Sequence, residues 1–175
     1  IAAALAAEAW RRRWQPAGLV LALGTALSLA VAWPLPVRLT DYPTAADMPP
    51  VYAWLARQPG DFAILELPMP RRVTDESRRD IVRQGWVLTH GKRRLDGFSG
   101  FVPPDLEVFR MTMAGFPRPG ALRAAARRGA HLIIVHYADY PPADARALGE
   151  AAAAAPALRE TVRFGDDVVY ELIRE

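Results

Sequence analysis

The chain has 175 residues, 51% of them hydrophobic and 23% charged, which suits a folded domain with a core and excludes a disordered chain. It has no cysteine, which excludes disulfides, thiolate nucleophiles and cysteine-based zinc or iron–sulfur sites. Much of the net charge of +3 comes from the run Arg11 to Arg13. The 19 basic and 18 acidic residues after the N-terminal region nearly balance, so no nucleic-acid partner is expected.

The N-terminal region is dominated by an uncharged apolar segment, residues 17–33. A helix of about 17 residues spans roughly 26 Å, and continuing it to residue 37 brings it to the 30 Å of a bilayer core. We therefore expect a transmembrane helix over 17–37. The chain begins at Ile1 without an initiator methionine and with a helical pattern, so we expect further residues upstream.

The flanks of this segment predict its orientation. Tryptophans stand on both sides as interfacial anchors: Trp10, Trp14 and Trp33. The arginine run favours the cytoplasmic side, so residues 1–16 are expected in the cytoplasm and the rest outside. The alternative is a cleaved signal peptide, because the arginines resemble an n-region and residues 30–32 fit an A-x-A cleavage site. Both interpretations export the domain.

Beyond the apolar segment, prolines and turn formers over 38–50 predict an extended linker to a domain at 51–175. The domain opens with a short helix at 51–58 and a buried strand at 62–67. The charged stretch 71–83 is expected to be a loop that runs into a helix.

The middle and end of the domain alternate between helix and strand patterns. Residues 86–89 fit a helix or a strand, and 90–104 is expected to be an ordered loop. The remaining elements are helices at 105–113, 119–128 and 142–155, a strand at 131–136, and a terminal hairpin of 158–164 with 168–173. This order predicts an α/β or α+β fold, a small mixed-sheet sandwich with flanking helices, preceded by one transmembrane helix.

Three stretches carry a family resemblance: PPVYAWLARQPGDFAILELPMP, HGKRRLDGFSGFVPP and ALRAAARRGAHLIIVHYADY. With the proline-rich exit from the apolar helix, they resemble the C-terminal extracytoplasmic region of polytopic bacterial membrane proteins related to the GT-C glycosyltransferases. The resemblance implies transfer of a sugar from a lipid-phosphate donor in the inner membrane of the cell envelope, with the C-terminal domain periplasmic. In such proteins the catalytic acidic residues lie in loops between earlier membrane helices, so no catalytic residue is assigned here.

The resemblance also implies partners: the lipid bilayer, the protein's own upstream membrane helices, and a lipid-linked sugar or acceptor. Residues suited to hold a phosphate, pyrophosphate or sugar lie in one glycine-bounded loop: His90, Lys92, Arg93, Arg94 and Asp96. The alternative is a solvated basic loop that meets anionic headgroups.

Aromatic residues and one carboxylate complete the candidates. Tyr52, with Phe98 and Phe101, is suited either to stack on a sugar ring or on the membrane surface, or to close a core. Glu66 stands in an apolar strand, where a buried carboxylate has either a catalytic role or an arginine partner. Asp75 and Glu76 are expected on the surface.

No metal or cofactor site is expected. His131 and His136 are five residues apart on a strand and therefore face opposite sides. The sequence contains no nucleophile elbow, P-loop or G-x-G-x-x-G motif.

Three functions follow from these observations. The first is a non-catalytic accessory domain of a membrane glycosyltransferase-like protein, in contact with lipid-linked sugar or acceptor. The second is a membrane-anchored structural or partner-binding module. The third is an exported hydrolase that uses Glu66 with His90 or Asp96, which requires these side chains to meet in one pocket.

Overall fold

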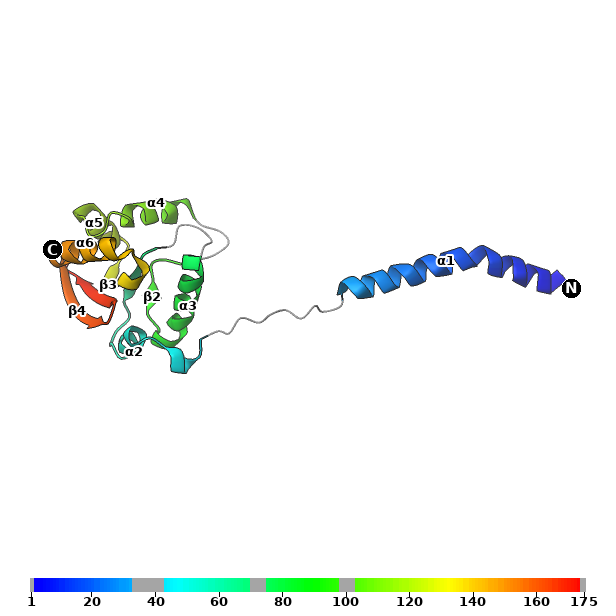
Figure 1. Cartoon of the computed structure of the whole chain (residues 1–175), viewed down its shortest axis with the longest axis horizontal. Coiled ribbons are helices and arrows are strands. Elements are labelled where there is room, and N and C mark those ends of the chain that lie inside the picture. The colour runs from blue at the N-terminus through cyan, green and yellow to red at the C-terminus, as the bar shows by residue number, and fades with distance from the viewer. Residues whose placement is uncertain (1, 33–42, 70–74, 98–102, 174–175) are drawn as a thin grey trace. The chain divides into compact units, whose positions relative to one another are not determined.

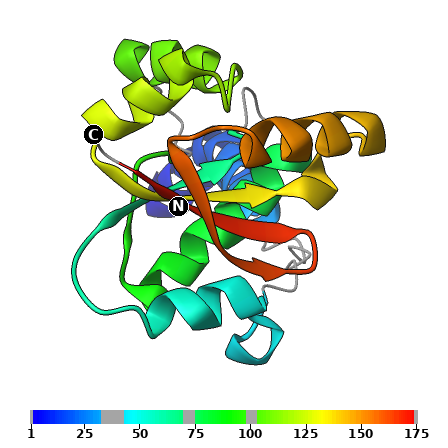
Figure 2. The ribbon, with the colours of Figure 1, turned by 90° about the vertical axis from the view of Figure 1, so that its left-hand side faces the viewer.

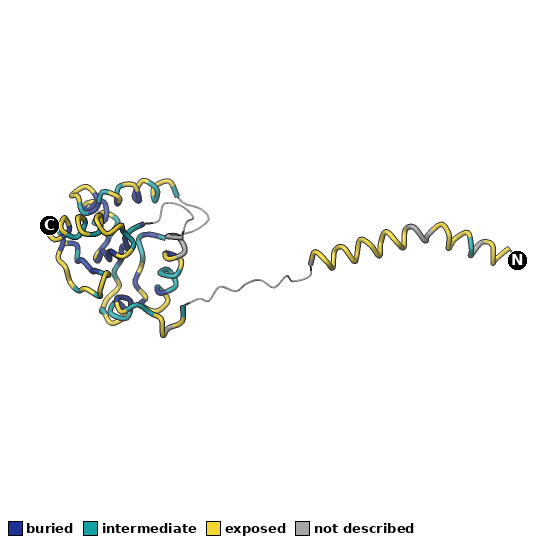
Figure 3. Tube along the Cα trace, in the orientation of Figure 1, coloured by how far each residue is buried: buried dark blue, intermediate teal, exposed yellow. Residues whose placement is uncertain are grey.

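The computed structural model describes residues 2–32, 43–69, 75–97 and 103–173. They belong to two compact units that divide between residues 41 and 42, and each is described by itself (Figure 1). The first contains one long helix, α1 (Ala2–Ala32), whose described side chains are nearly all exposed (Figure 3). Among the described residues, α1 is the one helix long and apolar enough to cross a membrane. A signal sequence near the N-terminus meets the same criterion of length and composition.

The expected span and linker fall partly on residues that the structure does not describe. Residues 33–37 of the span and 38–42 of the linker lie outside the described ranges. Within 43–50, the chain forms a 3₁₀ turn, η1 (Ala45–Asp47), and the first residue of helix α2 (Pro50–Ala56). Pro50 takes the first position of α2, where its missing N–H costs no hydrogen bond.

The second unit alternates helices and strands. After α2, its further helical segments are α3 (Asp75–His90), α4 (Pro104–Met113), α5 (Pro119–Arg127), η2 (Tyr137–Asp139) and α6 (Pro142–Ala153). Its strands are β1 (Ala63–Leu67), β2 (Arg93–Arg94), β3 (Ala130–His136), β4 (Leu158–Phe164) and β5 (Asp167–Leu172).

The strands form one mixed sheet in the order β2-β1-β3-β5-β4. β1 is parallel to both β2 and β3, whereas β5 is antiparallel to β3 and to β4. Gly165 has a φ of +60° in the turn between β4 and β5, a conformation that glycine adopts without steric cost. The structure thus confirms the predicted α/β class with a mixed sheet.

Each face of the sheet has its own apolar core. Leu65 and Ile133 contribute to the core beneath α4, α5 and α6, and Ile64 and Ile134 to the core beneath α2 and α3. Figure 2 shows the helices α4 to α6 on one side of the sheet and α2 and α3 on the other. Because both faces are covered, β1 is buried at every position, as expected for a central parallel strand.

One segment takes one of its two predicted forms, and another differs from its prediction. Residues 86–89, expected as a helix or a strand, belong to one continuous helix, α3, and Val82 and Trp86 on this helix pack on the sheet. The expected loop 90–104 contains the short strand β2, in which Arg94 pairs with Ile64 of β1. The hydrophobic pattern of the sequence does not predict this strand, because β2 consists of two charged residues and forms through its pairing with β1.

The topology makes the carboxyl ends of β1 and β3 the expected place for a ligand. The chain leaves β1 for α3 on one face and leaves β3 for α6 on the other face. In open α/β sheets, the crevice beside strands that diverge in this way is the usual binding site.

Candidate functional site

A buried network of polar side chains lies at the carboxyl ends of the parallel strands, on the α2 and α3 face. Glu66 comes from β1, Arg94 from β2 and His136 from the last position of β3. We name it the Arg94 network and define it by Tyr52, Glu66, Asp80, Arg94, Asp96, His136 and Asp167.

Arg94 holds three carboxylates. Its Nη2 donates to Asp80 Oδ1 at 2.6 Å and to Asp96 Oδ2 at 2.5 Å, and its Nε donates to Asp96 Oδ1 at 3.1 Å. Glu66 Oε1 lies 3.3 Å from Nε as an ion pair, but without the geometry of a hydrogen bond. The bidentate fork to Asp96 fixes the guanidinium plane between β1 and α3.

The second oxygen of Glu66 accepts two further contacts. Tyr52 donates its hydroxyl to Oε2 at 2.8 Å, and His136 Nε2 lies 3.2 Å from the same oxygen. Burial opposes ionisation of Glu66, but Arg94, His136 and Tyr52 outweigh it and hold its pKa at about 2. Glu66 is therefore a fixed carboxylate at neutral pH.

His136 lies between two carboxylates. Its Nδ1 is 2.7 Å from Asp167 Oδ1, directly across the β3–β5 pair, and its Nε2 faces Glu66. Burial lowers its pKa, but the contacts with Asp167 and Glu66 outweigh burial and raise the pKa above its ordinary value. The imidazolium form has two N–H donors and so satisfies both carboxylates.

Among the carboxyl groups of the network with a resolved shift, Asp96 is the one that holds a proton most readily. Burial and the neighbouring Glu66 and Asp80 raise the pKa of Asp96 to about 6, against the lowering effect of Arg94. Several carboxylates around one guanidinium repel each other, so a shared proton relieves part of that repulsion.

The centre of the network is closed to solvent, whereas Asp167 at its edge is partly exposed. The side chains of Glu66, Asp96 and Arg94 are exposed by only 2%, 2% and 4%. Glu66 and Asp96 do meet, as the hydrolase hypothesis requires, but they meet through Arg94, and neither lines the two cavities described below. This arrangement fits a buried polar core that positions β2 and α3 on the sheet.

The other cations of the candidate loop do not converge with Arg94. Lys92 is buried, and its Nζ donates to the carbonyls of Gln58 and Gly60 at 2.6 and 2.7 Å, 4.5 Å from the ring centre of Phe62. Arg93 is exposed and pairs with Asp61 at 3.1 Å. The three cations predicted to bind one phosphate, Lys92, Arg93 and Arg94, therefore lie in three separate environments.

His90 and Tyr52 stack within the core, with ring centroids 5.7 Å apart. His90 Nδ1 accepts the backbone N–H of Lys92 at 3.0 Å, and burial lowers the pKa of His90. Burial and Glu66 raise the pKa of Tyr52, so its hydroxyl stays a donor. Both residues close a core, the second of the two roles considered for Tyr52.

The other candidate residues lie either away from the network or outside the residues that the structure describes. Phe98 and Phe101 lie outside the described residues, as do the side chains of Asp75 and Glu76 in the first turn of α3. His131 is exposed and packs on Phe62, away from His136. Among the described residues, no cluster of histidines and carboxylates is suited to a metal ion.

A pocket of about 280 Å³ opens beside the network, on the opposite face of the sheet. Its walls are mostly apolar and come from the end of β1 and from α4 and α6, with Arg110 and Tyr140 as the polar side chains. Arg110 is 4% exposed; its Nη2 donates to the carbonyl of Gly97 at 2.6 Å, and Nη1 lies 3.8 Å from Glu107. Its Nε has no partner among the described residues.

Arg110 is therefore a buried cation with incomplete compensation at the wall of an apolar pocket. Its one carboxylate partner, Glu107, is distant and partly exposed, so a further anionic group at this wall would be stabilised. The pocket lies at the divergence of β1 and β3, where the topology predicts a ligand.

Four residues that the structure places at the network or the pocket were not predicted as site residues from the sequence: Asp80, His136, Asp167 and Arg110. One signal was present for His136, because it ends a buried strand and the carboxyl ends of parallel strands share one edge of a sheet. Arg110 lies in the amphipathic helix α4, and the hydrophobic pattern of the sequence does not predict whether this arginine is buried or exposed.

Comparisons of the chain with models of known protein families, with curated proteins and with solved structures give no match.

Proposed function

We propose that this chain is a membrane-anchored, extracytoplasmic accessory domain of a glycosyltransferase-like membrane protein. In this proposal, the domain binds the anionic phosphate of a lipid-linked sugar or acceptor and does not catalyse transfer. The observation that carries the binding role is Arg110, a buried and incompletely paired cation on the wall of the apolar pocket at the carboxyl end of β1.

The pocket suits a ligand that combines negative charge with apolar surface. Met69, Met113 and Phe116 supply apolar walls, and the guanidinium of Arg110 offers charge-assisted hydrogen bonds to phosphate oxygens. An isoprenoid or acyl phosphate has both features.

Two further observations support an accessory role. The apolar helix α1 supplies an anchor by length and composition. The acidic groups that resemble a catalytic set are ion-paired and buried in the Arg94 network, so they support the fold and not a reaction. A buried pair of this kind contributes little net stability, but removing one partner is costly.

Binding of farnesyl phosphate to the full chain in phosphatidylcholine nanodiscs tests the proposal. We expect saturable binding that Arg110→Gln weakens at least about tenfold, because hydrogen bonds to charged groups contribute roughly 1.5–3 kcal/mol. Arg57→Gln, an exposed arginine far from the pocket in sequence, is the matched control and should bind as the parent chain does.

Two results would contradict the proposal. Equal binding of farnesyl phosphate by Arg110→Gln and the parent chain would refute the proposed binding site at Arg110. Hydrolysis of a nitrophenyl glycoside or nitrophenyl phosphate by the full chain, abolished by Glu66→Gln in a folded protein, would establish the hydrolase instead.

A further inference from the structure

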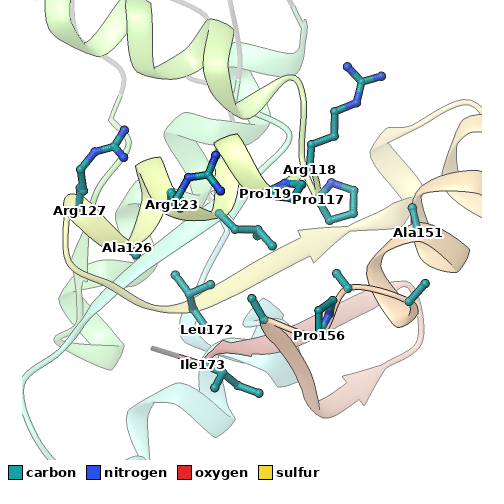
Figure 4. Close-up of a pocket in the computed structure, with 14 residues that line it drawn as sticks. Pro117, Arg118, Pro119, Arg123, Ala126, Arg127, Ala151, Pro156, Leu172 and Ile173 are labelled. Atoms are coloured by element: carbon teal, nitrogen blue, oxygen red, sulfur yellow. The ribbon is translucent and has the colours of Figure 1, made fainter. Parts of the chain in front are cut away.

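A second and larger cavity lies on the α5 and α6 face. It has a volume of about 840 Å³ and runs between α5, the connection from α6 to β4, and the end of β5 (Figure 4). Leu122 and Leu172 form a buried floor, and Ile173 at its edge is 45% exposed. We name this cavity the α5 groove.

The polar side chains of the α5 groove are all cationic. Arg118, Arg123 and Arg127 line one side of it, and the other lining residues are alanines, prolines, leucines and one isoleucine. Figure 4 shows these arginines on the α5 side, across from Pro156 and Ile173. None of the lining residues is acidic.

These three arginines have no carboxylate partner among the described residues, although other arginines of the domain do. Arg128, the next residue along the chain, pairs with Asp105 at 2.7 Å, and Arg163 pairs with Glu160 at 2.9 Å. The apolar floor is therefore bordered by positive charge that the described residues leave unneutralised. Such a surface is complementary to an anion with an apolar tail.

We propose that the α5 groove binds an anionic phospholipid, with an acyl chain on the floor and the phosphate against the arginines. The inference rests on the proposed function in one respect, the anchoring of the chain in a bilayer. An acyl chain has no hydrogen-bonding groups and matches a floor without polar side chains, whereas a peptide brings backbone groups that need partners.

The length of the connection supports a lipid as occupant. Ten residues, 33–42, join α1 to the α/β unit, and a fully extended chain of that length reaches about 35 Å. A domain tethered so closely to a bilayer meets lipid at high local concentration.

The test is photocrosslinking of the full chain in phosphatidylcholine nanodiscs that contain phosphatidylglycerol with a photoreactive group on one acyl chain. Mass spectrometry of the digested protein maps the adducts. We expect adducts on peptides that contain 119–127 or 154–157. Since each arginine near an anionic surface contributes a factor of about five, Arg118→Gln/Arg123→Gln/Arg127→Gln should reduce the groove adducts at least about fivefold.

Two variants separate charge from shape. Arg57→Gln/Arg146→Gln removes two exposed arginines that do not line the groove and should leave its adducts unchanged. Ala154→Trp fills the groove with charge unchanged and should also reduce the adducts, because Ala154 is an exposed lining residue.

The outcomes distinguish this proposal from the proposed function. Adducts on 17–31 but none in the groove would overturn the lipid site and leave the anchor intact. Equal groove adducts with photoreactive phosphatidylcholine would refute the need for an anionic headgroup. Protein–protein crosslinks between the grooves of two chains, in place of lipid adducts, would assign the groove to a second copy. Absence of adducts on 17–31 would contradict the membrane anchor. The adducts on the groove peptides are measured separately, so they test the lipid site independently of the anchor.

Discussion

At the scale of single residues, Glu66 connects more of the domain than any other carboxylate described. It links the hydroxyl of Tyr52 in α2, the imidazole of His136 in β3 and the guanidinium of Arg94 in β2. Each contact comes from a different element, so Glu66 joins α2 to three adjacent strands of the sheet. A buried carboxylate in an apolar strand is tolerated here because its charge is matched on all sides.

We expect Glu66→Gln to lower the free energy of unfolding by about 2–4 kcal/mol, because it leaves the charges of Arg94 and His136 without one carboxylate. Denaturant unfolding of the full chain in detergent measures the change. Asp61→Asn, which breaks the exposed pair with Arg93, is the control and should cost less than about 0.5 kcal/mol. Equal losses in the two variants would mean that the network does not stabilise the fold.

The pKa values of the two buried histidines should be shifted in opposite directions from the ordinary value of histidine. The pKa of His136 is raised by Asp167 and Glu66 against burial, and the pKa of His90 is lowered by burial. A proton NMR titration should therefore place the His136 midpoint above 6.5 and that of His90 below it. The opposite order would show that the imidazole of His136 is not held between its two carboxylates.

The same shift predicts how stability depends on pH. A raised folded-state pKa means that the contribution of His136 is fully present below about 6.5 and is lost as the pH rises through the folded value. Asp167→Asn should flatten this loss above pH 6.5. Asp166→Asn, one residue earlier in the same turn, is the control and should retain the slope of the parent chain.

At the scale of elements, α1 and α3 show how the same residue type has different consequences in different places. Leu23 and Leu27 of α1 are 60% and 67% exposed, within a segment that has no charged residue from 17 to 31. Leu88 of α3 is 93% exposed, but it is a single apolar residue on a mixed surface. A continuous exposed apolar surface is typical of a segment that contacts a membrane or another protein, whereas a single exposed apolar residue needs no explanation.

Leu23→Arg/Leu27→Arg should therefore release the chain from membranes, since each arginine at the centre of a span costs about 2.5–3.5 kcal/mol. Alkaline extraction of membranes from expressing cells measures the released fraction. Leu88→Arg adds a charge to an exposed position of the α/β unit and should leave the chain in the membrane pellet. Release of the parent chain itself would favour the cleaved signal peptide.

At the scale of the whole molecule, the central position of β1 and β3 should determine which parts open last. β1 is buried at all five positions, and β3 is exposed only at His131. β4 is at the sheet edge and mostly exposed. Local opening is easiest where few buried contacts must break.

Hydrogen exchange followed by mass spectrometry checks this order in the full chain. We expect peptides from β1 and β3 to exchange at least about tenfold more slowly than peptides from β4. Protection of β4 equal to that of β3 would indicate that the edge strand is covered by a partner or a second copy.

The sequence by itself determined the types of most elements and the mixed α/β class. A continuous apolar run between polar ends identified β3, a shorter apolar run ended by Pro68 identified β1, and Gly165 with the two aspartates after it identified the hairpin turn. These signals are local, because the propensity and the period of an element depend on residues close together in the chain. The uncharged run at 17–31 predicted a long apolar helix for the same reason.

Only the tertiary structure decided which side chains meet. Strand order places β2 and β3 on either side of β1, and register pairs His136 with Asp167, so groups 31 residues apart come within 2.7 Å. The same packing buries Arg94 and Lys92 and leaves Arg93 in solvent, although all three stand in one short stretch. Hydrophobic periodicity carries no information about these long-range choices, because they follow from how the faces of separate elements pack together.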